Sequence, residues 1–212
     1  MFEWAWPWVL VLLPLPWLVA RVLRPAQAQE SAALKVAFVQ THARLIAACV
    51  DALVERFGRG GRLLVMGNGG SACDAQHVAV EFQHPIVEKR RALPALALSA
   101  DAALLSAVGN DADFSQVFAQ QIDLLARPED AVLGISSSGQ SANVNRGLRR
   151  AGERGALTIG FAGRDGGAMV ELCQFCFVVP AWSIHRIQET HTLLLHLLWD
   201  QVHIALGEPD VL

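Results

Sequence analysis

Five short apolar runs recur along the chain, and none of them alternates between polar and apolar residues. They are Leu63–Met66, Ala95–Leu98, Ala131–Ile135, Leu157–Phe161 and Phe175–Val179. Uniformly apolar runs of this length are typical of strands buried on both faces, as in a parallel sheet. Helix-like segments accompany them, at Ser31–Phe57, Ser71–Gln83, Phe114–Ala126, Ser141–Arg154, Gly166–Leu172 and about Ser183–Leu206. This alternation predicts a three-layer, doubly wound α/β fold of parallel strands, in which ligands bind beyond the carboxyl ends of the strands.

The first thirty residues differ from the rest. Residues 4–23 carry no charge before Arg21, and as a helix this run would span roughly 30 Å, about the thickness of a bilayer core. Residues 24–30 are interpreted as a linker, so that the folded domain would occupy residues 31–212. The run is interpreted as a membrane anchor, whose flanking arginines would keep the domain cytoplasmic. The alternatives are a start that is foreign to the fold or disordered, and a secretion signal ending near Ala26-Gln27-Ala28.

Size and charge narrow the function classes. The chain has 212 residues, enough for one α/β domain with a full core. Its formal charge is −3, and nucleic-acid-binding proteins usually show a basic stripe instead. Nucleic acid is therefore not expected as a partner. Cys173 and Cys176 have the spacing of a redox site or half a zinc site, but the sequence offers no second pair. They are expected to be buried, reduced thiols.

Two predicted strands end in loops suited to an anion. The first, Gly67–Ser71, holds three glycines and opens a helix whose first amide groups lack internal partners. The second, Ser136–Ser141, offers serine hydroxyls and loop amides as donors. One such loop alone is more often an ordinary turn, but two in one domain indicate a phosphate site. Because neither loop has a P-loop lysine or the GxGxxG pattern, a sugar phosphate is favoured over a nucleotide.

Four further side chains could carry chemistry. His77 and Glu81 are four residues apart and share one face of the helix after the first loop. Gln188 and His196 lie along one stripe of the last helix. Together they could bind zinc or a similar divalent ion, or supply an acid and a base without metal. The other histidines, His42, His84, His185, His191 and His203, are assigned to the surface, the core or an interface. Gly109-Asn110-Asp111 is by itself only a turn.

As a set and in order, these motifs resemble the phosphoheptose isomerase (sedoheptulose-7-phosphate isomerase) family of sugar isomerase (SIS) domains. The motifs are Gly67–Ala72, Asp74–His77 with Glu81, Gly109–Asp111, Ser136–Val144, and Arg186–Glu189 with His191 and His196. The resemblance covers roughly residues 31–206. It implies a five-stranded parallel sheet between helices, and a homotetramer with sites at subunit interfaces. The implied reaction converts sedoheptulose 7-phosphate to D-glycero-D-manno-heptose 7-phosphate, toward the heptose of lipopolysaccharide or other surface glycans.

The resemblance also implies residue roles. Substrate would be bound by Asn68, Gly69, Gly70, Ser71, Glu81, Asn110, Asp111, Ser136, Ser137, Ser138, Ser141 and Gln188. One zinc ion per site would be held by His77, Glu81, Gln188 and His196. Glu81 and His196 would transfer protons through an enediol, and zinc would polarise the carbonyl.

The chain departs from the family pattern just after Glu81. The isomerases commonly continue there with a Gly-Arg-aromatic segment, whereas this chain has Phe82–Val87, with Pro85 in place of the arginine. Gln140 also stands where asparagine is usual. An isomerase of another sugar phosphate, and a non-catalytic sugar-phosphate-binding or replication-regulator-like protein, are therefore kept as alternatives. Glu81 and His196, which the non-catalytic branch lacks, favour an enzyme.

Overall fold

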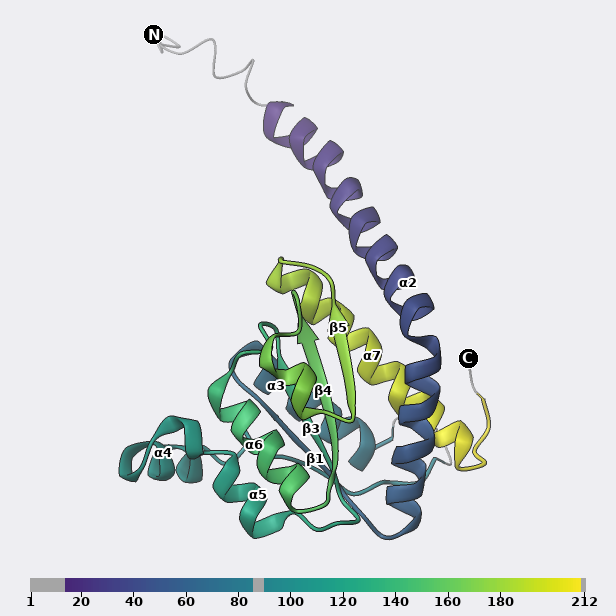
Figure 1. Ribbon diagram of the computed structural model, residues 1–212. Helices are drawn as coiled ribbons and strands as arrows, with labels where there is room; N and C mark the ends of the chain where they lie inside the picture. The colour runs from purple at the N-terminus through teal and green to yellow at the C-terminus, as the bar shows by residue number, and fades with distance from the viewer. Residues whose placement is uncertain (1–13, 86–89, 211–212) are drawn as a thin grey trace, which may run out of the picture.

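The predicted parallel sheet is confirmed. The computed structural model describes residues 14–85 and 90–210. Its sheet has five parallel strands in the order β2-β1-β3-β4-β5. The strands are β1 (Leu63–Gly67), β2 (Ala95–Ala97), β3 (Ala131–Ser136), β4 (Leu157–Gly163) and β5 (Phe175–Val179). Each apolar run overlaps one strand, and helices cover both faces of the sheet (Figure 1), which explains why the runs need no polar alternation.

Helices form the two outer layers. They are α2 (Pro14–Gly58), α3 (Gly70–Gln83), α4 (Ala102–Asp111), α5 (Ala119–Leu125), α6 (Ala142–Glu153) and α7 (Ile184–Ala205), with the 3₁₀ helices η1 (Phe114–Gln116) and η2 (Gly167–Leu172). Val65 and Leu133 belong to the core on the side of α2, α3 and α7. Their neighbours Leu64 and Val132 belong to the core on the side of α5, α6 and η2. Successive strand residues thus feed opposite cores, as the pleat of a strand requires.

The two loops predicted to bind an anion leave neighbouring strands. β1 pairs with β3, and Gly67 lies opposite Ile135 in the register. The loops therefore begin side by side, at Asn68 and at Ser136. From β1 the chain proceeds to β2 on one side, and the later strands build the sheet on the other side. A strand order that reverses in this way opens a crevice at the carboxyl ends, where α/β proteins bind ligands.

Helix α2 corrects one prediction. Residues 24–30 are not an unstructured linker but part of a continuous helix that begins at Pro14. Alanine and glutamine, which dominate this stretch, are good helix formers. Contacts with α7 also hold it, because Arg186 donates to the Gln27 carbonyl oxygen at 3.0 Å and the Ser31 hydroxyl donates to Glu189. The N-terminal half of α2 extends away from the domain (Figure 1). The division at residues 1–30 and 31–212 stays a prediction.

The apolar run proposed as an anchor is only partly visible. Its residues 4–13 lie outside the described residues, and residues 14–23 are helical. Among the described helices, the stretch Ala26–Gly58 is long and apolar enough to cross a membrane by length and composition. Phe38, Ile46 and Leu53 of that stretch are buried in the core of the domain. Burial against the sheet and α7 therefore accounts for only part of its apolar character, since 28% of its 18-residue apolar window is buried.

Three local predictions also change. Phe114–Ala126 is divided between η1 and α5, and Gly166–Leu172 forms a 3₁₀ helix. Gly109–Asp111 is not a turn but the end of α4, a helix that the hydrophobic pattern did not predict. Among the residues of α4 only Val108 is buried, so the helix has no apolar stripe to reveal it.

The cysteines and two of the unassigned histidines lie where simple packing places them. Cys49 is buried, Cys173 and Cys176 are half-buried, Cys73 is exposed, and all four are free thiols. His191 and His203 are buried core residues. The burial expected of the C-x-x-C pair is therefore only partial, and the reduced state of these thiols stays a prediction.

His191 is expected to make the stability of the fold depend on pH. Its Nε2 donates to the Ala162 carbonyl oxygen at 3.0 Å, and burial lowers the pKa of His191 to about 4. The unfolded chain, with a histidine pKa near 6.5, binds more protons between these values. The contribution is therefore complete above about pH 6.5 and is lost as the pH falls toward 4. The free energy of unfolding should therefore fall between pH 7 and pH 5. His191→Gln, which keeps an N–H donor, should make this fall about 2 kcal/mol smaller in urea unfolding. The exposed His84→Gln serves as the control, and an unchanged pH slope in His191→Gln would contradict the assignment.

Candidate functional site

Helices α3 and α7 bring three ionisable side chains together. Nε2 of His77 lies 3.2 Å from Oε1 of Glu81 and 3.4 Å from Nε2 of His196. One donor atom from each of the three residues lies within 4.8 Å of the others. Helical spacing alone brings His77 next to Glu81, whereas His196 arrives from the other end of the chain through the packing of α7 on α3.

The charge state of this cluster suits a cation. Burial, and then His77, lower the pKa of His196, whereas Glu81 raises it. His196 is therefore a neutral imidazole near pH 7, able to accept at one nitrogen. Two imidazole nitrogens that face each other, with a carboxylate oxygen beside them, form a donor set that zinc prefers. The residues present thus fit a zinc ion.

Gln188 approaches the same region from α7 and lies against the glycine loop. A Cβ atom at Gly70 would stand 2.2 Å from the Gln188 side-chain nitrogen, so only glycine permits this contact. Gly69 has a φ of +55°, a conformation that glycine adopts without strain. Ser71 is buried, and its amide donates to the Asn68 carbonyl oxygen at 3.0 Å. The positive φ of Gly69 and the bond between Ser71 and Asn68 thus define the conformation of the loop Asn68–Ser71. Gln188 packs against this loop at Gly70.

The serine loop is a compact group of hydroxyls at the end of β3. Ser136 Oγ lies 2.9 Å from Ser141 Oγ and 3.5 Å from Ser138 Oγ, and Ser137 is half-buried between them in the chain. Ser141 stands at the N-cap of α6, but its hydroxyl contacts Ser136 rather than the helix amides. Several donors thus face one small region next to a helix N-terminus, which suits a phosphate group.

Asn110 and Asp111 are not brought to this group. They are exposed at the end of α4, where Asn110 donates to Asp111 at 2.8 Å. Helix α4 projects from the edge of the domain, on the side away from α7 (Figure 1). Within one chain the structure therefore leaves these two predicted substrate contacts apart from His77, Glu81 and His196.

Two further residues contact the site residues directly: Trp199, which no sequence pattern singled out, and Asn143, which lies within the Ser136–Val144 motif but was given no role of its own. The Trp199 indole donates from Nε1 to the Glu81 carbonyl oxygen at 2.8 Å. That carbonyl belongs to the last turn of α3, which has no partner inside the helix. Asn143, which is buried in the first turn of α6, bonds the side chain of Asn68. Trp199 follows His196 by three residues on α7, a spacing that could have suggested a shared face.

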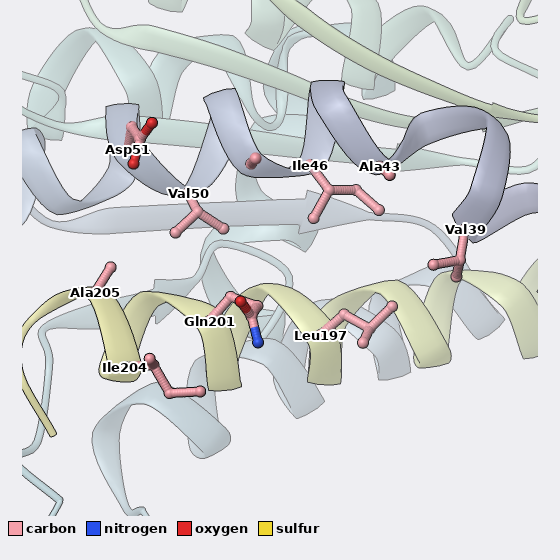
Figure 2. A pocket seen from close by; sticks show the side chains of 10 residues that line it. Val39, Ala43, Ile46, Val50, Asp51, Leu197, Gln201, Ile204 and Ala205 are labelled. Carbon is pink, nitrogen blue, oxygen red and sulfur yellow. The ribbon is translucent and has the colours of Figure 1, made fainter. Parts of the chain in front are cut away.

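An apolar groove lies elsewhere, between α2 and α7 (Figure 2). Its volume is about 380 Å³. It is lined by Val39, Ala43, Ile46, Ala47, Val50, Asp51, Leu197, Gln201, Ile204 and Ala205. None of the predicted site residues is among them. Mostly hydrocarbon walls offer little to a sugar phosphate, so the groove is not a candidate for the chemistry.

Comparison with known proteins identifies relatives of the whole domain. Residues 28–163 match the family model described as the SIS domain. The phosphoheptose isomerase of Pelobacter propionicus is 49% identical over 162 residues, which are 76% of this chain and 86% of that protein. The phosphoheptose isomerase of Aquifex aeolicus is 42% identical over 174 residues, covering 82% of this chain and 91% of that protein.

A solved structure gives the same result. The phosphoheptose isomerase of Neisseria gonorrhoeae superposes with a TM-score of 0.80 and is 34% identical. The superposition covers 86% of this chain and 97% of that chain. The sequence comparison and the fold comparison therefore identify the same family.

Proposed function

Because the chain belongs to the phosphoheptose isomerase family of SIS domains, we propose that it converts sedoheptulose 7-phosphate to D-glycero-D-manno-heptose 7-phosphate. The observation that carries this proposal is the convergence of His77, Glu81 and His196 in a domain whose two predicted phosphate loops leave neighbouring strands. The product would serve heptose biosynthesis for lipopolysaccharide or another surface glycan. The sugar phosphate is the partner, and nucleic acid is not expected.

The arrangement suggests how substrate would lie. Hydroxyls of Ser136, Ser137, Ser138 and Ser141 would hold the phosphate. The glycine loop, Asn68 to Ser71, would border the sugar chain, because it leaves the neighbouring strand. The reacting end would then reach Glu81 and His196, and Gln188 would close the site from α7. Asn110 and Asp111 would take part only from a second chain, since their own α4 lies apart.

The chemistry needs two kinds of proton transfer. Glu81, whose side chain is 16% exposed, would remove the proton from the carbon next to the carbonyl group and return it to the neighbouring carbon. His196 would take the proton from one oxygen of the enediol and deliver it to the other, which a neutral imidazole can do through its two nitrogens. The net change moves one hydrogen between adjacent carbons and one between adjacent oxygens.

We assign one zinc ion to His77, Glu81, Gln188 and His196. When bound, zinc would polarise the carbonyl oxygen and stabilise the negative charge of the enediolate. His77 has no separate proton-transfer role in this proposal, and its place between Glu81 and His196 suits a ligand.

The test is turnover of sedoheptulose 7-phosphate by the purified full chain, with fructose 6-phosphate as a second ketose phosphate. Treatment with a chelator should abolish turnover, and added zinc should restore it. If the chain turns over fructose 6-phosphate but not sedoheptulose 7-phosphate, it is an isomerase of another sugar phosphate. Binding without any turnover would assign the chain to the non-catalytic sugar-phosphate-binding class. Full activity after metal removal would reject zinc and keep the acid–base pair.

We also propose that the chain assembles as a homotetramer, which the exposed apolar groove between α2 and α7 supports (Figure 2). Light scattering should give a four-chain mass for the wild type. Ala43→Glu puts a charge into the groove and is expected to lower that mass. Ala48→Glu is the control, because Ala48 is exposed on the same helix outside the groove lining. An unchanged mass in Ala43→Glu would exclude this surface.

We propose finally that residues 4–23 contact a membrane and hold the domain on its cytoplasmic face. Cell fractionation should find the full chain with membranes and a version that starts at Ser31 in the soluble fraction. That version keeps the contact between Ser31 and Glu189. If both versions are soluble, the segment is not an anchor.

A further inference from the structure

Two reciprocal hydrogen bonds join the glycine loop to the helix behind the serine loop. Asn68 Nδ2 donates to Asn143 Oδ1 at 2.8 Å, and Asn143 Nδ2 donates to Asn68 Oδ1 at 2.8 Å. Asn143 is 3% exposed, so water does not compete for these bonds. In this pair each Nδ2 faces the Oδ1 of the other amide. If one amide were reversed alone, nitrogen would face nitrogen and oxygen would face oxygen.

A backbone amide fixes which way the pair is oriented. Asn143 Oδ1 also accepts from the Val144 amide at 2.9 Å. Since a backbone N–H can only donate, the oxygen of Asn143 must face Val144, and its nitrogen must face Asn68 Oδ1. Asn68 is then held with one N–H in the pair, and its second N–H is free for a ligand.

We infer that Asn143 is a positioning residue for the substrate, because it fixes the side chain of Asn68 as a hydrogen-bond donor. This inference rests on the proposed function, in which Asn68 contacts the sugar. A sugar hydroxyl or carbonyl oxygen is the chemistry that such a donor recognises. The sequence alone showed neither the pairing nor the direction in which the Asn68 amide points.

A second buried asparagine of α6 provides a matched comparison. Asn145 is 8% exposed, and its Nδ2 donates to the Gly139 carbonyl oxygen at 3.0 Å. It therefore fastens the serine loop, whereas Asn143 fastens the glycine loop. Both are buried polar residues in the first turn of the same helix, but only Asn143 touches Asn68.

The experiment is a double-mutant cycle on kcat/KM for sedoheptulose 7-phosphate. Asn143→Ala is expected to lower kcat/KM roughly tenfold, the usual effect of losing a buried hydrogen-bond partner. In the Asn68→Ala background the same change should cost almost nothing, since its effect passes through Asn68. Asn145→Ala should lower kcat/KM by the same factor with or without Asn68. If Asn143→Ala lowers kcat/KM by the same factor in the wild type and in the Asn68→Ala variant, the inference is overturned.

Stability is measured on every variant, so that unfolding is not mistaken for lost positioning. If Asn143→Ala does not fold, Asn143→Asp replaces it in the cycle. The aspartate keeps the size and the acceptor for the Val144 amide but loses the donor to Asn68 Oδ1. It is expected to show the same dependence on Asn68, and independence from Asn68 would overturn the inference.

The proposed function and this inference fail in different ways. If the wild-type chain does not turn over sedoheptulose 7-phosphate, the proposed function fails and calorimetric affinities for that sugar phosphate replace kcat/KM in the cycle. Inorganic phosphate is the second probe, because it needs only the serine loop. Asn143→Ala should weaken the binding of the sugar phosphate but not that of inorganic phosphate. Asn145→Ala should weaken the binding of both. Equal weakening of both probes by Asn143→Ala would overturn the inference.

Discussion

Replacing Glu81 by glutamine is expected to lower kcat roughly 10²- to 10⁴-fold, the range that a positioned acid–base group contributes. Glutamine has the size of glutamate and can still contact His77, but its amide cannot accept a proton at neutral pH. The Trp199 bond to the backbone carbonyl of residue 81 does not involve the side chain, so α3 should stay in place. The measurement is steady-state turnover of sedoheptulose 7-phosphate, together with zinc content.

Exchange of the substrate's carbon-bound hydrogen with deuterated water, followed by NMR, tests the same step directly. Glu81→Gln should abolish this exchange even where zinc remains bound. Glu55→Gln is the control, since Glu55 is an exposed carboxylate on α2 that pairs with Arg59. Exchange at the wild-type rate in Glu81→Gln would show that another group removes the proton.

The second large effect is expected at Gly139, the turn of the serine loop. Its φ is +65°, and a Cβ atom there would stand 1.9 Å from the Gly166 carbonyl oxygen. Gly139→Ala must therefore move the loop away from η2, and we expect a loss of about 3 kcal/mol in the free energy of unfolding, the scale of strain and overpacking combined. Because Asn145 holds the same loop through the Gly139 carbonyl, the KM for substrate should rise as well.

Gly155→Ala separates the two causes of that loss. Gly155 also has a positive φ, +80°, but its nearest neighbour for a Cβ atom is Pro128 at 3.6 Å, an ordinary contact. Only the conformational cost, about 1 kcal/mol, is expected there, with no change in KM. If urea unfolding gives equal losses for Gly139→Ala and Gly155→Ala, the contact with η2 does not constrain the loop.

The sheet could be predicted because its burial leaves a direct trace in the sequence. A strand covered on both faces is largely apolar, and the central strands β1, β3 and β4 are buried at every position. The edge strands β2 and β5 are less buried but equally apolar. Helix α4 left no trace, because burial of Val108 alone produces no periodic pattern. The linker expected at residues 24–30 is instead helical, because its alanines and glutamines favour a helix and the contacts of Arg186 and Ser31 hold it to α7.

The site divides in the same way between local and distant causes. Helix spacing suggested that His77 and Glu81 on one helix, and Gln188 and His196 on another, share a site, and the family resemblance, now confirmed by the relatives, agrees with that grouping. The roles of these residues and the zinc ion stay predictions. The contacts of Trp199 and Asn143 could not be found, because a carbonyl cap and an amide pair join segments more than 70 residues apart without any repeating pattern. Asn110 and Asp111 show the limit of one chain, since among the described residues no contact brings them to Glu81.

Helix α2 is unbroken from Pro14 onward, so residues 14–30 have a fixed direction relative to the domain. A helix turns by about 100° and advances 1.5 Å for each residue. One alanine inserted between Gln29 and Glu30 would therefore swing everything before it by about a quarter turn around the axis, while the domain after Ser31 keeps its place. A surface that contacts residues 14–29 would then meet a different side of the domain. The number of residues in this helix, rather than their chemistry, would set which way the crevice at the carboxyl ends of the strands points.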